Sequence, residues 1–127
     1  MDATQAQVLV DKYIEAYNGF DVPGMLACLH PDVQFEHSTN GDVTVRLDGK
    51  AAFEAQATRA AAWFRERTQH VTAFRWQDEQ AEAAIDYFAT TATDLPNGIK
   101  AGTILQFAGR SVFSFRDELI AFIQDFS

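Results

Sequence analysis

Positive charge is scarce in this sequence and is nowhere concentrated. Ten Lys and Arg residues stand against 18 Asp and Glu residues, which gives a formal net charge of −8 at pH 7. Proteins that bind polyanions present clustered positive charge, so we expect no nucleic-acid partner. The acidity indicates solubility, and it carries no information about a substrate.

Cysteine and long apolar runs are also scarce. The single cysteine, Cys28, has no partner for an internal disulfide, and its apolar neighbours predict a buried structural thiol. No run approaches the roughly 18 apolar residues of a membrane-spanning helix, and residues 1–5 have neither the basic nor the apolar region of a secretion signal. We therefore expect a soluble, cytoplasmic protein with no membrane partner.

The sequence lacks the patterns that mark a metal, a nucleotide or a serine-hydrolase site. Its histidines, His30, His37 and His70, show no paired spacing of the kind that metal sites use. There is no glycine-rich phosphate loop and no Ser-His-Asp order. No metal and no cofactor are therefore expected.

What the chain does have is enough apolar content for one folded core. Of its 127 residues, 47% are hydrophobic and 13% are aromatic. This size and composition fit one globular domain over residues 1–127, without repeats or linkers.

Helical periodicity predicts three helices in the first half of the chain. Apolar residues at three- and four-residue spacing indicate the first helix, with Asp2 as its N-cap and Gly19 as its stop. Asp21 caps a shorter helix that Pro31 closes, and an Ala-rich stretch with one apolar stripe indicates the third. The predicted ranges are residues 3–18, 21–29 and 50–67.

Period-two alternation predicts strands elsewhere. Asn40 and Gly41 give a type I′ turn signal between two alternating runs, which predicts a hairpin. After the third helix the chain is typical of strands at about residues 68–77, 81–93, 99–115 and 119–126. The third of these is long, and Gly109 near its middle indicates a bulge or bend, so we expect a strongly curved sheet.

Two aspartates within apolar strand-like runs are the best evidence for a site. Asp86 and Asp125 each lie among hydrophobic neighbours. Because an ionised carboxylate is costly to bury without a partner, such acids usually face each other, a donor or a ligand cavity. His37 shares strand parity with Val33 and Phe35, hence the apolar face. We therefore predict that Asp86, Asp125 and His37 converge on one internal cavity.

Three segments resemble sequence features of the nuclear transport factor 2-like superfamily. They are KYIEAYN at residues 12–18, GMLACLHPDV at residues 24–33 and IAFIQD at residues 120–125. The group includes ketosteroid isomerases, limonene-type epoxide hydrolases and SnoaL-like polyketide cyclases. The resemblance implies an α+β cone, in which a strongly curved, mixed and mostly antiparallel sheet wraps around three helices and encloses a pocket. It does not select one activity, because this scaffold hosts many chemistries and also binding modules.

Comparison with the isomerases implies roles for three residues. Tyr13 matches the first-helix tyrosine of their oxyanion hole. The position of their catalytic base falls on His37, and a histidine can act as a base because its pKa is near neutrality. The position of their second acid falls near Ser111.

Comparison with the epoxide hydrolases and cyclases implies roles for the aspartates. The Asp-Arg-Asp group of the hydrolases corresponds to Asp86 and Asp125, with Ala84 in place of the arginine, so the counter-ion is missing at that position. Without a cation, two adjacent carboxylates would share a proton. Asp125 also matches the late-strand acid/base of SnoaL-like cyclases.

The favoured interpretation is a pocket that binds a hydrophobic small molecule and moves a proton on it, in isomerase, cyclase or hydrolase chemistry. The predicted catalytic residues are Asp125, as principal acid/base, Asp86 and His37. The predicted ligand-binding residues are Tyr13, Tyr17, Phe35 and Phe88.

Two alternatives stay open. The first is a non-catalytic binding module, and the second is a dimerisation domain whose pocket is vestigial. Under these readings the tyrosines are core aromatics, His37 is a satisfied core residue, and both aspartates are structural acids.

The late strands also predict a homodimer. They carry apolar side chains at both parities, and one helical layer covers only one face of a sheet. The other face would expose an apolar patch larger than soluble monomers normally tolerate, which a two-fold sheet-to-sheet contact would bury.

Overall fold

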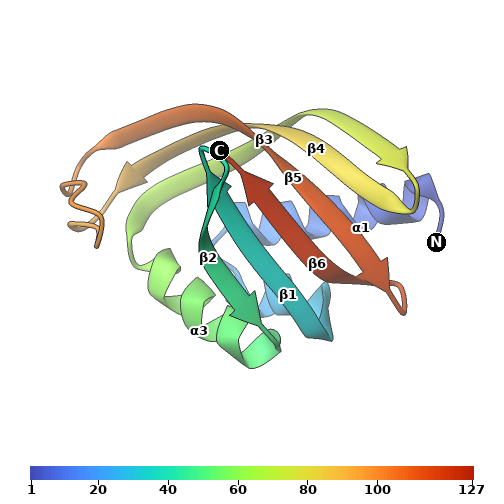
Figure 1. Cartoon of the computed structure of the whole chain (residues 1–127). Helices are drawn as coiled ribbons and strands as arrows, with labels where there is room; N and C mark the ends of the chain where they lie inside the picture. The colour runs from blue at the N-terminus through green and yellow to red at the C-terminus, as the bar shows by residue number, and fades with distance from the viewer.

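One sheet arches over the helices in the computed structural model, which describes residues 1–127 (Figure 1). The sheet is not closed into a barrel, and the fold is α+β, as predicted. The elements in chain order are α1 (Ala3–Asn18), α2 (Val22–Ala27), β1 (Leu29–Thr39), β2 (Asp42–Asp48), α3 (Lys50–Ala61), β3 (Phe64–Gln77), β4 (Gln80–Thr91), β5 (Ile104–Arg116) and β6 (Leu119–Phe126).

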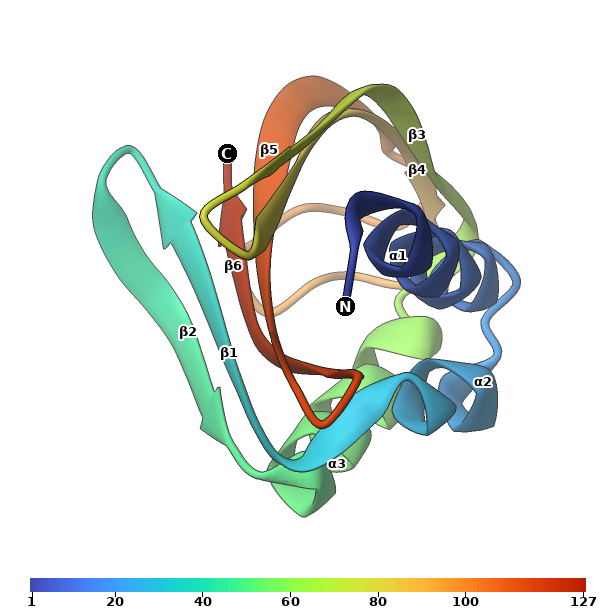
Figure 2. The ribbon, with the colours of Figure 1, turned by 90° about the vertical axis from the view of Figure 1, so that its right-hand side faces the viewer.

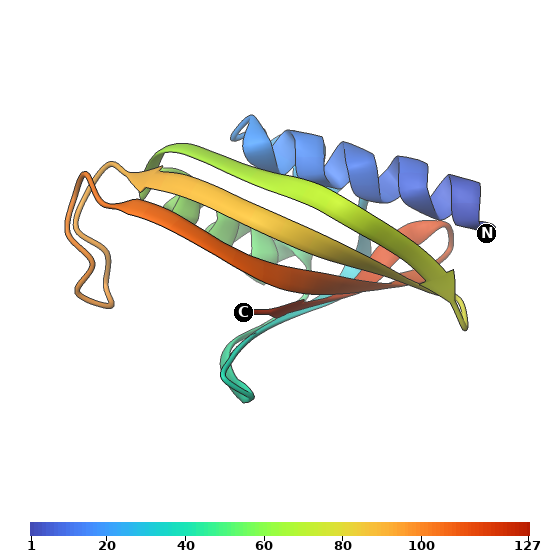
Figure 3. The same cartoon turned by 90° about the horizontal axis from the view of Figure 1, so that it is seen from above.

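The strands form one mixed sheet in the order β2-β1-β6-β5-β4-β3. Only β1 and β6 pair in parallel, and every other pairing is antiparallel. Figure 2 shows α1 lying inside the curve of the sheet, alongside β3 and β4, with α2 and α3 below it. Figure 3 shows the connection between β4 and β5, residues 92–103, projecting beyond the end of the long strands. This curvature leaves a concave inner face toward the helices and a convex outer face.

Local signals explain where α1 begins and ends. Asp2 accepts a hydrogen bond from the Gln5 backbone N–H, and the Gln5 side chain accepts one from the Asp2 N–H, forming a capping box. Gly19 follows the last helical residue, and its N–H donates to the Glu15 carbonyl. Both predicted bounds of this helix are confirmed.

The other two helices are shorter than the sequence predicted. The second ends at Ala27, because Leu29 pairs with Ile120 of β6 and starts β1. The third ends at Ala61, and Phe64 pairs with Thr91 of β4. In both places strand pairing across the chain overrides helix propensity.

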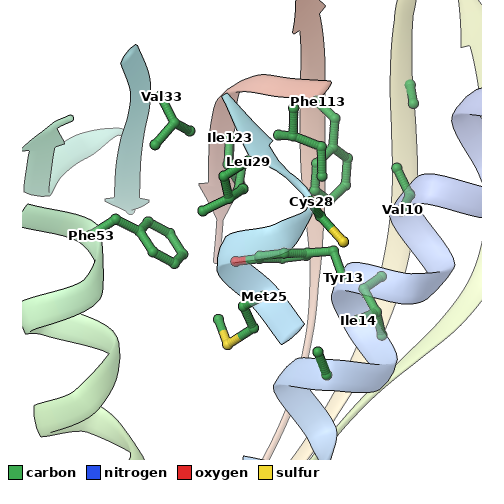
Figure 4. Packing of buried hydrophobic residues seen from close by; sticks show 14 of the residues in the cluster. Val10, Tyr13, Ile14, Met25, Cys28, Leu29, Val33, Phe53, Phe113 and Ile123 are labelled. Carbon is green, nitrogen blue, oxygen red and sulfur yellow. The ribbon is translucent and has the colours of Figure 1, made fainter. Parts of the chain in front are cut away.

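The core lies between α1, α2, α3 and the inner face of the sheet. Figure 4 shows Val10, Tyr13 and Ile14 of α1 directed toward the same interior as Phe113 and other apolar residues of the strands. Phe113 is almost fully buried and meets the Tyr13 ring edge-on at 6.0 Å between centroids. Cys28 is buried among these groups, as expected, and burial raises the pKa of its thiol.

None of the three helices has the length and apolar character that crossing a membrane requires.

Gly109 is required by a close backbone approach, not by a bulge at its own position. It pairs with Ile85 in register, and the register shift of β5 lies between Ser114 and Phe115. The bulge expected at Gly109 is therefore located elsewhere in the strand. A Cβ at position 109 would lie 2.6 Å from the Phe126 carbonyl oxygen. Because that oxygen belongs to the backbone, it cannot turn away as a side chain can.

Gly109→Ala is expected to destabilise the fold by about 1–3 kcal/mol, as overpacking of a rigid site does. Thermal unfolding measures the effect. Gly19→Ala is the matched control, because Gly19 has φ −89 and its added Cβ would meet the Glu15 carbonyl oxygen at 3.5 Å. Equal melting temperatures for Gly109→Ala and the unmodified protein would contradict the steric argument.

Candidate functional site

A cavity of about 640 Å³ lies between the inner face of the sheet and the helices. Small-molecule pockets commonly have volumes of roughly 300–1,000 Å³. Of the 30 lining residues, 18 are hydrophobic, so the cavity suits a largely apolar ligand. A few polar side chains interrupt this lining, and their placement decides what the cavity can do chemically.

Asp125 is held by strand pairing between two polar neighbours. It lies opposite His37 in the parallel pairing of β6 with β1, and opposite Ser111 in the antiparallel pairing with β5. The Ser111 hydroxyl donates a hydrogen bond of 2.6 Å to Asp125 Oδ1. All three residues line the cavity, so the predicted meeting of Asp125 and His37 is found.

Burial raises the pKa of Asp125 above its ordinary value. The Ser111 hydrogen bond and the nearby His37 charge act in the opposite direction, because both favour the ionised form. A carboxyl group with a raised pKa exchanges its proton closer to neutral pH than an exposed aspartate does. Asp125 thus has the environment of a proton donor and acceptor.

His37 reaches both the cavity and the end of the chain. Its Nε2 lies 3.0 Å from the Ser127 hydroxyl oxygen, and its ring is partly exposed. The ring therefore stays in contact with solvent while it faces Asp125. This arrangement places an imidazole ring, which can donate or accept a hydrogen bond, beside Asp125.

The tyrosines present neutral hydroxyl groups to the cavity. Burial raises the pKa of Tyr13, and the Asp125 charge raises it further. Burial also raises the pKa of Tyr17, whose hydroxyl oxygen lies 2.9 Å from that of Tyr87. Figure 4 shows the Tyr13 side chain reaching from α1 toward Met25 and Phe53. A hydroxyl that stays neutral can donate a hydrogen bond to a ligand oxygen.

Arg67 is a cavity residue that the sequence did not reveal. The pattern placed it at the end of the third helix, whereas it lies in β3 and is only 3% exposed. Arg67 has the same parity as Gln69 and Val71, which indicates the inner face of the sheet. This inference requires that the strand already includes Arg67, and the sequence did not indicate a strand start at Phe64.

Asp86 and Phe88 do not lie at the cavity. From Ala81 to Ala89 the buried residues of β4 are at odd positions, including Ile85 and Tyr87, and these point to the inner face. Side chains alternate along a strand, so Asp86 and Phe88 point to the outer face, where Phe88 is 44% exposed. The prediction that both aspartates converge on one cavity is therefore wrong. Phe35 does line the cavity, and its contact with a ligand stays a prediction.

The correspondence with an Asp-Arg-Asp group also fails on this geometry. Ala84 shares the parity of Asp86, so neither position faces Asp125. Two arginines of other strands do not replace the missing counter-ion, because Arg46 is paired with Glu36 at 3.3 Å and Arg110 with Glu82 at 2.8 Å.

Ser111→Ala is expected to raise the pKa of Asp125, because the lost hydrogen bond stabilises only the ionised carboxylate. The carboxyl carbon resonance of Asp125, followed by NMR through a pH titration, measures the change. Ser114→Ala is the control, since Ser114 lies on the same strand and bonds instead with Gln80. An unchanged or lower pKa in Ser111→Ala would contradict the assigned hydrogen-bond role.

Residues 10–123 match the family model of the SnoaL-like domain. Among solved structures, a protein from Xanthomonas campestris pv. campestris provisionally described as a polyketide cyclase has a TM-score of 0.83 at 23% identity, covering 98% of this chain and 90% of that one. A second, provisionally described as a SnoaL-like polyketide cyclase, from Jannaschia sp. CCS1, has a TM-score of 0.82 at 11% identity, covering 97% and 85%.

A third similar structure is a ketosteroid isomerase-like fold protein from Catenulispora acidiphila in complex with trimethylamine. Its TM-score is 0.77 at 14% identity, covering 94% of this chain and 84% of that one. No curated protein matches the sequence. At these identities the structural likeness shows the fold, whereas the site has to be judged from this chain's own residues.

Proposed function

The chain belongs to the SnoaL-like domain family, and from this premise we propose that it binds a hydrophobic small molecule in its cavity and catalyses proton transfer on it. The observation that carries the proposal is the environment of Asp125. This carboxyl group lies in an apolar cavity, has a raised pKa and is flanked by Ser111 and His37. A residue perturbed by burial and a specific donor, inside a ligand-sized cavity, is typical of catalytic acids and bases.

The chemistry that fits is proton removal from a carbon next to a carbonyl group. The ionised Asp125 accepts the proton, and electron density moves to the carbonyl oxygen. The neutral Tyr13 hydroxyl, in the same cavity, donates a hydrogen bond to that oxygen as its charge develops. Protonated Asp125 then returns the proton to another carbon in an isomerisation. In an aldol-type cyclisation it gives the proton instead to the new alkoxide oxygen.

A binding module without chemistry is the second candidate. It is favoured by one feature of the site: no arginine or lysine forms an ion pair with Asp125. Under this reading the cavity recognises an apolar ligand, and Asp125 only accepts or donates a hydrogen bond. Binding of cyclic ketones without proton exchange would support this candidate.

Proton transfer is testable with 2-tetralone, a ring ketone whose α-protons exchange with D₂O at a rate that NMR measures. The protein is expected to accelerate the exchange, and Asp125→Asn is expected to lose about 10²–10⁴-fold of the acceleration, the usual contribution of a positioned base. Asp86→Asn is the matched control, because Asp86 lies on the outer face of the sheet. An Asp125→Asn variant as active as the unmodified protein would exclude Asp125 as the base.

We also propose a homodimer formed through the outer face of the sheet. Apolar side chains of β4 and β5 remain on this face, including Phe88, which is 44% exposed, and Ile104, which is 76% exposed. Val112 adds a third apolar group near the middle of β5. No helix covers this face (Figure 2). Pairing of two such faces would remove the apolar surface from water.

Phe88→Glu is expected to shift the protein toward monomer, because it places a charge in the proposed contact. Sedimentation equilibrium at micromolar concentration distinguishes the dimer from the 14.2 kDa chain. Val8→Glu is the control, since Val8 is at least as exposed, at 49%, but lies on α1. A single 14.2 kDa species for the unmodified protein would refute the dimer.

A further inference from the structure

The cavity contains a buried arginine that the proposed proton transfer does not use. The Arg67 side chain comes from the inner face of β3 and is almost completely shielded from water. Its Nε donates a hydrogen bond of 2.9 Å to the Tyr17 carbonyl oxygen. Its Nη2 is buried and has no hydrogen-bond partner, and the guanidinium forms no ion pair. A buried cation with an unpaired donor is costly, so its position calls for an acceptor.

The position of the guanidinium is fixed by more than the Tyr17 carbonyl. Its central carbon lies 3.7 Å from the centroid of the Tyr17 ring and 4.7 Å from that of Phe20. These cation–π contacts hold the plane in place and compensate part of its desolvation. They leave Nη2 without a protein acceptor, on a side chain that lines the cavity. The group is thus pre-organised for an acceptor, which is how arginine recognises carboxylates.

The charges around the cavity favour an anion, although the chain as a whole carries −8. Apart from tyrosines, the lining side chains that ionise are Arg67, Arg110, His37 and Asp125. Arg110 is paired with Glu82 on the outer face. Asp125 is the only acidic side chain of the lining, and the Ser111 hydroxyl already donates a hydrogen bond to it. Arg67 is therefore the one permanent charge of the cavity that no protein group neutralises.

Arg67 and Asp125 both affect the same two tyrosines. The positive charge of Arg67 lowers the pKa values of Tyr13 and Tyr87, and the negative charge of Asp125 raises them. Arg67 and Asp125 form no ion pair with each other. A ligand that spans the cavity can therefore place an anionic oxygen at Arg67 while a carbon of its ring system approaches Asp125.

We infer that Arg67 binds the carboxylate of the ligand, and that the substrates of this protein are apolar, ring-containing carboxylic acids. This deepens the proposed function and rests on it. The ring system is indicated by the stacked pair of Tyr87 and Phe107, whose centroids are 4.8 Å apart at an interplanar angle of 22° beside the cavity. A carboxylate is favoured over a phosphate, because one arginine balances one charge and no lysine lines the cavity.

Isothermal titration calorimetry with 2-naphthoate and its neutral counterpart 2-naphthamide tests the inference. The two probes share a ring system and differ in charge. The unmodified protein is expected to bind 2-naphthoate at least about tenfold more tightly. Arg67→Gln is expected to bring this affinity ratio close to one, and Arg67→Lys to retain part of it. Arg46→Gln, which removes an exposed arginine paired with Glu36, is expected to keep the full ratio.

The ratio separates recognition from a structural role, because Arg67 also connects β3 to α1. A structural defect weakens both probes together and leaves their ratio unchanged, and that outcome in a folded Arg67→Gln would overturn the inference. Should Arg67→Gln fail to fold, an undiminished ratio in Arg67→Met, which also removes the charge, does the same. Equal affinities in the unmodified protein would overturn the carboxylate inference alone, leaving the proposed function. Absence of binding for both probes would overturn both.

Discussion

The pairing of β6 between β1 and β5 is the constraint on which the site depends. The contact of β6 with β1 is the only parallel one in the sheet and brings His37 to Asp125, and the antiparallel contact with β5 brings Ser111 from the other side. A one-residue change of register would turn all of these side chains to the opposite face. The hairpin turn at Asp117 and Glu118, both with positive φ, sets the register of β5 against β6 next to the turn, and the irregularity between Ser114 and Phe115 shifts it by one residue, so that Ser111 lies opposite Asp125. Backbone geometry far from the cavity thus determines the chemistry inside it.

Burial of Asp125 also opposes stability. Its pKa in the folded protein is raised, because desolvation outweighs the Ser111 hydrogen bond and the His37 charge. For a group of this kind, the contribution to stability is fully present below the unfolded-state pKa and is lost as pH rises through the folded-state value. The fold therefore carries an acid that weakens it as pH rises toward neutrality. Proteins retain such unfavourable groups mainly where function needs them, which agrees with a role in proton transfer.

The elements that could be predicted are those with local causes. The bounds of α1 follow from Asp2 and Gly19, and the position of Asp125 on the inner face agrees with its late-strand motif. The error on Asp86 arises where a resemblance was weighed above local alternation. Every odd position of β4 from Ala81 to Ala89 is apolar, whereas the even positions include Gln80 and Glu82. Parity alone therefore assigns Asp86 to the outer face, and the likeness to an Asp-Arg-Asp group indicated the opposite one.

Arg67 shows the second reason why part of the site was not predictable. Its side chain is at the cavity because β3 begins at Phe64, and that start depends on pairing with β4 rather than on local propensity. The preceding Ala-rich segment favours helix, so helical periodicity gave no reason to stop at Ala61.

The same pairing has a functional consequence, because it places Arg67 and Asp125 on different strands of one concave face. If the two charges met, they would neutralise each other, and the cavity would have little need of a charged ligand. Arg67 lies on β3 and Asp125 on β6, and the charges of both affect the pKa values of Tyr13 and Tyr87. Because the two groups are separated, each can interact with a ligand in the cavity. The sheet that makes the cavity thus also keeps the charges of Arg67 and Asp125 on separate strands.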